Sequence, residues 1–289
     1  MSTFETGQAK SGGSVDLHCH STASDGFLSP TALVHKAQSV GLQVIALTDH
    51  DTVDGVAEAQ SAAAGTSLSI VPGIELSSNH DDFELHLLGY FVDSSSTQLL
   101  AHLGWCQGKR IDRIQRMCER LTGIGLPLSF DDVLAHSSEG SVGRPHVALA
   151  MIDRGYVRSI GEAFERYLAT GRPAFVKRDN VAPAQAIAII IEAGGVAVMA
   201  HPLTAGHYQH LLPDLIAAGL GGLEAHYGEY NPASRARIAT VARQNGLIAT
   251  GGSDYHGDGF KEGRGLGAVD VPPAVVEELR SAARSQARA

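Results

Sequence analysis

The stretch SVDLHCHSTASDG, residues 14–26, places two histidines on either side of one residue. The apolar run before them predicts a strand over residues 15–18. Side chains two residues apart on a strand share a face, so His18 and His20 aim together while Cys19 points away. Two converging imidazoles indicate either a metal site or a wet sheet face, and the rest of the chain decides between these.

The bulk composition is that of a well-buried globular protein. The chain has 289 residues, of which 44% are hydrophobic and 18% charged, which is typical of one large α/β domain or a barrel with an insertion. No apolar run approaches the roughly 20 residues of a membrane span, and the polar residues 1–13 predict a flexible tail without a signal pattern. A net charge of −9 argues against a broad basic surface for duplex DNA. Three cysteines without CxxC spacing, Cys19, Cys106 and Cys118, indicate a reducing cytoplasm rather than a disulfide framework.

Strand and helix signals alternate through most of the chain, which predicts a parallel sheet with right-handed crossovers. The expected strands are 15–18, 44–47, 68–71, 84–90, 196–200, 223–225 and 247–250; the expected helices are 30–40, 53–64, 184–193, 211–218 and 233–245. Between these blocks the pattern is helical. The predicted division is a tail (1–13), a first barrel part (14–93), a helical insertion (94–183) and a second barrel part (184–289).

Histidines and carboxylates collect where the predicted strands end. They are His18, His20, Asp25, His50, Glu75, His201, Asp254 and His256, with His86 inside its strand. Loops from many strands converge at the carboxyl ends of a parallel barrel, where chemistry collects. A single histidine after a strand is more often a structural residue, but the whole set predicts a metal site. Imidazoles and carboxylates without thiolates suit Mn²⁺, Zn²⁺ or Fe²⁺, and this many ligands imply two or three divalent ions that clamp phosphoryl oxygens and generate a hydroxide nucleophile.

The motifs DLHCHSTASDG, LTDHD, PGIEL, ELHLLGY, AHP and GGSDYH, in this order, resemble those of the PHP (polymerase and histidinol phosphatase) family of metal-dependent phosphoesterases. The resemblance implies a distorted (β/α)7 TIM-like barrel with up to three metals, most often Mn²⁺. It assigns His18, His20, Glu75 and Asp254 to one ion, Glu75, His86 and His201 to a second, and Asp25, His50 and His256 to a third. It gives the catalytic roles to His18, His20, Glu75, Asp254 and His256.

One position departs from part of the family, because some branches have a histidine where this chain has Asp25. A carboxylate there implies weaker binding of the third ion, or a different metal. The insertion motifs GRPH (143–146) and PAFV (173–176) resemble the branch that includes nucleoside 3′,5′-bisphosphate phosphatases and 5′-to-3′ exoribonucleases acting on short RNA.

Four further residues are candidates for substrate contact. Arg144 offers paired N–H donors that match a phosphate, although an arginine there also fits a helix cap or a surface ion pair. His146 either assists it or packs beside Pro145. Lys177 adds positive charge or is a solvated surface residue, and His226 follows a strand end near the expected site.

The predicted activity is hydrolysis of a nucleotide phosphate ester by a metal-bridging hydroxide. The expected substrates are nucleoside 3′,5′-bisphosphates, losing the 3′-phosphate, or short 5′-phosphorylated oligoribonucleotides, with no duplex DNA and no membrane as partner. A histidinol-phosphate-type phosphatase, an amidohydrolase-like C–N hydrolase and a metal-dependent binding module stay open as alternatives. The sequence leaves the substrate among these, the native metal and the oligomeric state undecided.

Overall fold

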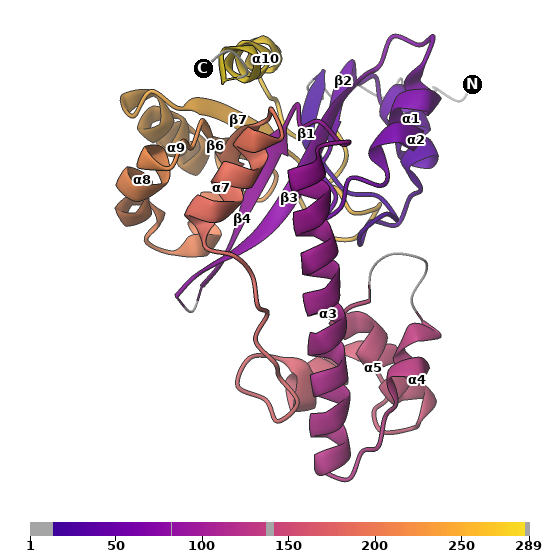
Figure 1. Cartoon of the computed structure of the whole chain (residues 1–289). Coiled ribbons are helices and arrows are strands. Elements are labelled where there is room, and N and C mark those ends of the chain that lie inside the picture. The colour runs from indigo at the N-terminus through magenta and orange to yellow at the C-terminus, as the bar shows by residue number, and fades with distance from the viewer. Residues whose placement is uncertain (1–13, 82, 137–141, 287–289) are drawn as a thin grey trace, which may run out of the picture.

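A computed structural model describes residues 14–81, 83–136 and 142–286 of the protein. The predicted tail, 1–13, lies outside the described residues. Helices surround one twisted sheet, and a helical body extends away from one end of it (Figure 1).

The sheet has seven strands that follow one another in chain order. They are β1 (Val15–Cys19), β2 (Val44–Leu47), β3 (Ser69–His80), β4 (Phe83–Tyr90), β5 (Val196–Met199), β6 (Gly222–Tyr227) and β7 (Ile248–Gly252). The two outer strands approach each other just beyond β7, where the His20 amide donates to the Tyr255 carbonyl at 2.9 Å and the Tyr255 amide donates to the His18 carbonyl at 3.2 Å. The sheet is therefore a nearly closed barrel of seven strands, which confirms the predicted fold class.

The prediction of an all-parallel sheet is wrong at β4, which runs antiparallel to both β3 and β5. Only two residues separate His80 on β3 from its partner Phe83 on β4. A connection this short permits only a hairpin, because a parallel crossover needs a dozen or more residues. The hairpin also lengthens β3, so Glu75 lies inside a strand rather than beyond its end, while His86 lies within its strand as expected.

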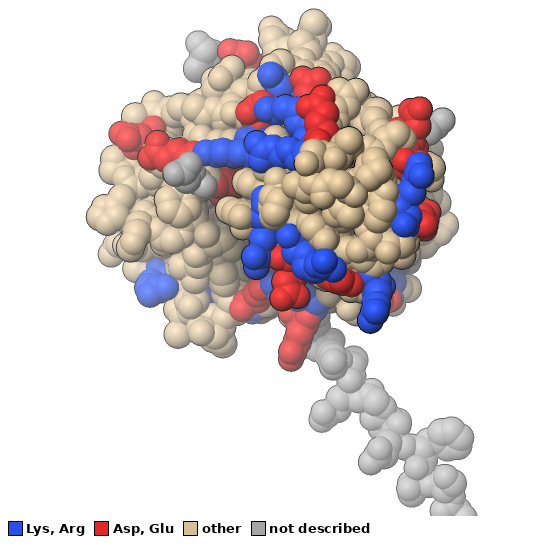
Figure 2. Space-filling view, turned by 90° about the horizontal axis from the view of Figure 1, so that it is seen from below, with Lys and Arg blue, Asp and Glu red and all other residues tan. Residues whose placement is uncertain are grey.

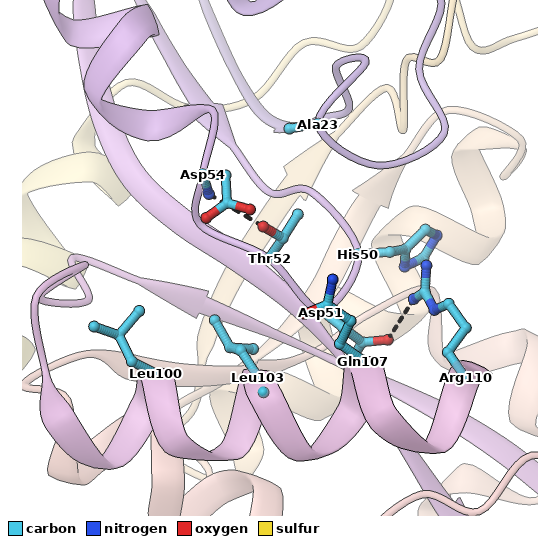
Figure 3. A pocket seen from close by; sticks show the side chains of 10 residues that line it. Ala23, His50, Asp51, Thr52, Asp54, Leu100, Leu103, Gln107 and Arg110 are labelled. Carbon is cyan, nitrogen blue, oxygen red and sulfur yellow. Dashed lines mark hydrogen bonds and ion pairs between the residues drawn. The ribbon is translucent and has the colours of Figure 1, made fainter. Parts of the chain in front are cut away.

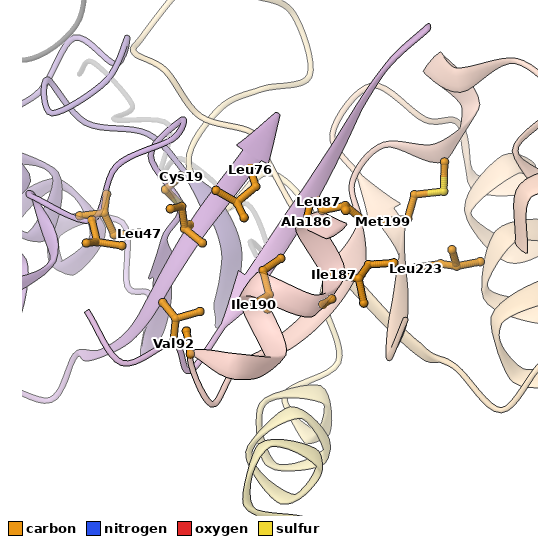
Figure 4. Packing of buried hydrophobic residues seen from close by; sticks show 14 of the residues in the cluster. Cys19, Leu47, Leu76, Leu87, Val92, Ala186, Ile187, Ile190, Met199 and Leu223 are labelled. Atoms are coloured by element: carbon orange, nitrogen blue, oxygen red, sulfur yellow. The ribbon is translucent and has the colours of Figure 1, made fainter. Parts of the chain in front are cut away.

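Helices cover the outside of the barrel. They are α1 (Pro30–Ser39), α2 (Val56–Ala63), α7 (Pro183–Glu192), α8 (Tyr208–Ala217) and α9 (Pro232–Gln244), with the 3₁₀ turn η2 (Pro202–Ala205) after β5. The expected helix over 53–64 begins three residues later, at Val56. Figure 4 shows α7 against the sheet, with Ile187 and Ile190 beside Leu87 of β4 in one buried cluster. Burying such apolar faces contributes most of the stability of the barrel.

The C-terminal helix α10 (Ala274–Gln286) lies at the end of the barrel away from the helical body (Figure 1). Its Val275, Val276 and Leu279 share a buried cluster with Val15 and Val198 of the strands. This end of the barrel is therefore filled by apolar side chains, and polar chemistry is confined to the other end.

The helical body forms around α3 (Thr97–Gly123), which spans about 40 Å at 1.5 Å per residue. The remaining elements are α4 (Phe130–Leu134), α5 (Arg144–Asp153), α6 (Ile160–Ala163) and the π-helical turn η1 (Phe164–Leu168). The first turns of α3 place Leu99 and Leu103 in the barrel core. From Ile114 onward its buried residues belong to a separate cluster that extends to Val176. One helix thus joins two cores, and we refer to the part from 111 to 176 as the insertion.

No helix among the described residues is both long and apolar enough to span a membrane.

Candidate metal centre

The predicted metal ligands lie together at the end of the barrel that faces the insertion. Their donor atoms form three groups, each within 4.8 Å: His18, His20, Glu75 and Asp254; His20, Asp25, His50 and His256; and His50, Glu75 and His86. His201 joins them through its Nε2, which lies 3.1 Å from Glu75 Oε1. Residues separated by up to 238 positions in the chain are brought together because they lie in, or follow, six strands of the same barrel: β1, β2, β3, β4, β5 and β7.

Glu75 occupies the middle of the cluster and is fully buried. Five imidazoles surround its two oxygens: Oε2 lies 3.1 Å from His18 Nε2, 3.2 Å from His20 Nε2 and 3.3 Å from His50 Nδ1, and Oε1 lies 2.9 Å from His86 Nδ1 and 3.1 Å from His201 Nε2. One carboxylate with histidines on both oxygens has the arrangement of a bridging ligand between two ions.

Asp254 and His256 close the opposite side of the cluster. Asp254 Oδ1 lies 3.2 Å from His20 Nε2, and His256 Nε2 lies 3.3 Å from Asp25 Oδ1. Asp25 belongs to the loop after β1 and also lies 3.8 Å from His50 Nε2. Asp25 is thus near the residues with which the resemblance grouped it.

The donor set fits divalent transition-metal ions. Metal–ligand bonds of about 2.1 Å place neighbouring donor atoms roughly 3.0–3.4 Å apart around one ion, which is close to the separations around Glu75. Both ring nitrogens of His20 and Nδ1 of His50 are buried without a hydrogen-bond partner in the described chain. Buried polar atoms are seldom left unpaired, so these nitrogens are suited to ligate ions.

Two details differ from the expected grouping. His20 belongs to the group around Asp25 as well as to that around Asp254, and His50 belongs to the group of Glu75 and His86. Each of these residues therefore belongs to two neighbouring ligand groups and could serve either of them when ions are bound.

The buried carboxylates of the cluster require positive charge nearby. Burial alone raises the pKa values of Glu75 and Asp254, but the surrounding histidines outweigh it and hold both pKa values below their usual range. In return, although burial opposes it, these carboxylates raise the pKa of His20, and Glu75 raises that of His86, in each case to about 10. Burial instead lowers the pKa of His50 to about 4. Bound divalent ions would supply the positive charge that protons on His20 and His86 otherwise supply.

Two buried carboxylates that the sequence reasoning missed orient the ligands. Glu224 Oε1 lies 2.8 Å from His18 Nδ1, and its Oε2 accepts a hydrogen bond from the His201 amide at 2.7 Å. Asp16 accepts from the amide and hydroxyl of Ser253 at 2.8 and 2.6 Å. Such contacts fix the ring orientation of ligating histidines. The sequence signal that could have identified both carboxylates is a single acidic residue inside an apolar strand, in GGLEAHY and in SVDLH.

The second carboxylate oxygen of Asp254 also has partners in the chain. Oδ2 accepts a hydrogen bond from the Tyr227 hydroxyl at 2.8 Å and lies 2.8 Å from Nη1 of Arg264. Its backbone has a φ of 56°, a region that non-glycine residues seldom occupy. With Oδ2 engaged in this way, Oδ1 faces the histidines.

Asp51 links the metal centre to the two chain segments that lead into and out of the insertion. It follows His50 directly, and its Oδ2 pairs with Arg110 of α3 at 3.1 Å and with Arg178 at 2.6 Å. Figure 3 shows Arg110 reaching from α3 toward Asp51, with His50 alongside. The Ser77 amide and hydroxyl donate to the same carboxylate at 2.8 and 3.1 Å. The two arginines hold the pKa of Asp51 below its usual range despite burial.

Arg144 and His146 lie at the same site as the predicted ligands. Both line a cavity of about 750 Å³ between barrel and insertion, whose wall also contains Asp25, His50 and His86. The Arg144 guanidinium lies 5.5 Å from the centre of the Phe164 ring. Nδ1 of His146 accepts from the Gly143 amide at 2.9 Å and so also caps the start of α5.

The structure places Lys177 and His226 apart from this cavity. The Lys177 ammonium donates to the Asp81 carbonyl at 2.7 Å at the tip of the β3–β4 hairpin. The charged groups near His226 are Arg235 and Asp270 rather than the metal cluster. Neither residue lines the cavity, so the structure adds no support to their expected substrate contacts, which stay predictions.

Fold and site together define a barrel protein that can bind metal ions at one end. A family model described as the PHP domain matches residues 16–174. The chain belongs to this family, as its sequence motifs predict.

Several characterised proteins are similar to the chain over most of its length. A 5′-3′ exoribonuclease of Haemophilus influenzae is 38% identical, over 83% of this chain and 89% of that protein. A 3′,5′-nucleoside bisphosphate phosphatase of Chromobacterium violaceum is 33% identical, over 90% and 93%. A phosphoribosyl 1,2-cyclic phosphate 1,2-diphosphodiesterase of Eggerthella lenta is 32% identical, over 84% and 94%. All three relatives are named for the hydrolysis of phosphate esters.

Two solved structures share the whole fold. One is a proposed metal-dependent phosphoesterase of Bifidobacterium adolescentis, with a TM-score of 0.82, 32% identity and coverage of 95% of this chain and 98% of that one. The other is described as an amidohydrolase from Chromobacterium violaceum with bound sulfate and no metal; its TM-score is 0.80, its identity 32% and its coverage 93% and 96%.

Proposed function

We propose that the protein is a metal-dependent phosphoesterase that hydrolyses phosphate esters of nucleotides. The observation that carries this proposal is one cavity in which a buried His–carboxylate cluster faces several guanidinium groups. Arg110, Arg113, Arg144 and Arg178 line it together with Asp25, His50 and His86. Metal ions and arginines are the groups that stabilise charge on a transferring phosphoryl group.

The ions, when bound, supply Lewis acidity and a low-pKa water. We assign them to the ligand groups described above, with Mn²⁺ as the preferred metal and Fe²⁺ or Zn²⁺ as alternatives, because imidazole and carboxylate donors suit all three. Glu75 orients the histidines on both sides of itself, and Glu224 holds His18 and the His201 backbone from outside. The chain thus keeps its ligands preorganised.

Arginine positions favour a substrate with more than one phosphate or a phosphodiester backbone. The Arg144 guanidinium lies on the insertion wall, while Arg178 is held by Asp51 and also lies 3.2 Å from Glu84 Oε1. One group can orient the scissile phosphate and another a second phosphate, as in a 3′,5′-bisphosphate or a short 5′-phosphorylated RNA. The names of the relatives support both substrates.

Duplex DNA is a poor fit to this surface. Viewed from the insertion end, basic and acidic side chains are interspersed rather than gathered into one basic field (Figure 2). Non-specific binding to duplexes depends on such a field. We therefore expect a small nucleotide or a short single strand as partner. The three free cysteines support a reducing, cytoplasmic location.

A C–N hydrolase is the second candidate, because one structural neighbour is described as an amidohydrolase. No lysine lines any of the three described cavities that contain cluster residues. Glu75 occupies the bridging position that such an enzyme gives to a modified lysine. Phosphate chemistry is therefore the better-supported function.

The test is a phosphate-release assay with Mn²⁺, comparing adenosine 3′,5′-bisphosphate with a short 5′-phosphorylated RNA whose products are resolved by length. Release of the 3′-phosphate alone makes the protein a nucleotide phosphatase; stepwise shortening from the 5′ end makes it an exoribonuclease. Histidinol phosphate and simple amides serve as rival substrates, and preferred turnover of either rejects the proposal.

The matched control separates chemistry from folding. Asp254→Asn removes a ligand charge, whereas Asp258→Asn changes an exposed carboxylate that pairs with Lys36 at 2.7 Å. We expect loss of turnover only in the first variant. Near-full activity of Asp254→Asn at unchanged metal content contradicts the mechanism.

A further inference from the structure

The cavity at the metal centre is larger and more apolar than a phosphoryl group requires. The cavity has a volume of about 750 Å³, and its wall includes Phe27, Ile160, Phe164 and Phe260 beside the charged residues. Phosphates are held by charged and N–H donors, and an apolar wall indicates an apolar part of the ligand. A second substrate group must account for these side chains.

Phe27 and Phe260 are the aromatic side chains most open to this cavity. They are 63% and 44% exposed, and their ring centres lie 5.8 Å apart at 82°. Single exposed phenylalanines are ordinary on protein surfaces. These two contact each other, and the Phe260 ring also stacks on the His256 imidazole with centres 4.6 Å apart and planes at 12°. An aromatic path therefore leads from a candidate metal ligand to the mouth of the cavity.

The backbone at Phe27 is tied to the segment that carries His256. The Phe27 amide donates to the His256 carbonyl at 2.6 Å. A Cβ at Gly257, whose φ is +155°, would lie 2.5 Å from the ring, and a Cβ at Gly26 would lie 2.5 Å from the His20 carbonyl oxygen. Only glycine permits such close approach at these two positions, one against the Phe27 ring and the other against the His20 backbone. The loop after β1 thus presents an exposed aromatic ring two residues beyond Asp25.

We propose that Phe27 and Phe260 form a stacking platform for the nucleobase of the substrate, with Ile160 on the insertion wall limiting the space. The inference rests on the proposed function and specifies its substrate class as base-bearing phosphate esters rather than simple sugar phosphates. A base stacks by its π-face on an aromatic ring, and every base has one. The platform therefore recognises that a base is present more than which base it is.

The first test compares two substrates in Phe27→Leu and Phe260→Leu. One substrate is adenosine 3′,5′-bisphosphate, and the other is the same bisphosphate with hydrogen in place of the base. Stacking contributes roughly 1–3 kcal/mol per base, so we expect the ratio of kcat/KM between the two substrates to fall on the order of 10-fold. Phe260→Tyr, which keeps an aromatic ring, should have the same ratio as the wild type.

Phe83→Leu is the matched control, because Phe83 is 60% exposed and lines none of the described cavities. Its ratio should equal that of the wild type. An unchanged ratio in both cavity variants overturns the platform, as does an equal loss on both substrates, which indicates a structural role.

The second test is independent of turnover. The fluorescence of 2-aminopurine riboside 5′-monophosphate is quenched when its base stacks, so titration into the metal-loaded wild type should show quenching that Phe27→Leu reduces. Equal quenching in both proteins overturns the platform. If the wild type hydrolyses neither the nucleoside bisphosphate nor the short 5′-phosphorylated RNA, the proposed function fails, and the fluorescence titration still decides the platform by itself.

Discussion

The barrel and the insertion use charged side chains in opposite ways. In the barrel, histidines and carboxylates from several strands face one another around Glu75. In the insertion, arginines of α3 reach backbone carbonyls and exposed acids of the returning chain: Arg113 Nε donates to the Val176 carbonyl at 2.9 Å, Arg116 pairs with Asp179 at 3.0 Å, and Arg120 donates to the Phe175 carbonyl.

This difference separates the reaction from the choice of substrate. The ligand positions are fixed by a closed sheet and by carboxylates behind the ligands, so changing one strand disturbs the whole centre. The insertion wall depends on one long helix and one returning segment. Its side chains can change without altering the metal ligands, as is typical of substrate-binding elements on a rigid scaffold.

Replacing the central carboxylate should have the largest effect. Glu75→Gln removes the charge that five histidines share, and we expect metal content to fall and phosphate release to drop about 1000-fold, because metal assistance contributes several kcal/mol to such reactions. Metal analysis and the Mn²⁺ assay measure both. Glu58→Gln, on the exposed side of α2, is the control and should behave as the wild type.

Removing support behind the ligands should have an intermediate effect. Glu224→Gln weakens the hold on His18 and on the His201 backbone, and loss of such contacts typically costs 10- to 100-fold in metal affinity or activity. Titration with Mn²⁺ measures the affinity. An affinity equal to that of the wild type argues that the sheet alone orients the two histidines.

A change in the insertion should affect binding more than chemistry. Arg144→Lys keeps the charge but loses the paired donors, and we expect KM for the bisphosphate to rise on the order of 10-fold. Metal content should stay unchanged. Arg172→Lys, at an exposed position of the same region, is the control. If the metal content of Arg144→Lys falls as much as its KM rises, the metal centre and the insertion wall are not independent of each other.

The smallest effect concerns the pH dependence of the metal-free barrel. Because the folded pKa values of His20 and His86 are raised to about 10, their contribution to stability is present below pH 6.5 and is lost as pH rises through 10. Burial lowers the pKa of His50, so the protonation of that residue changes the stability only below pH 6.5. The melting temperature of protein freed of metal by a chelator should fall as pH rises from 7 to 10. Added Mn²⁺ should remove this decline.

Hydrogen exchange localises that change. Amides of β1 and β4 should lose protection with rising pH in the metal-free protein, whereas amides of α4 and α5 should change little. A uniform loss across both regions shows that the barrel and the insertion unfold as one unit.

Local patterns of the sequence determined most of the barrel. Strand and helix alternation predicted seven strands, and the strand-end histidines predicted which residues gather, because the carboxyl ends of neighbouring strands meet. The motifs also predicted the family. The antiparallel β4 did not follow from this pattern, because the predicted strands 68–71 and 84–90 left twelve residues between them and only the structure extends β3 to His80.

Tertiary structure alone decided the partners. No spacing relates Glu224 to His18, or Asp51 to Arg110 and Arg178, because these contacts depend on how the sheet closes and where α3 crosses it. The same holds for the candidate substrate residues: Arg144 lines the metal cavity through the packing of the insertion, while His226 lies near Arg235 and Asp270 instead. Sequence fixes which side chains a strand presents, and the closure of the barrel decides which of them meet.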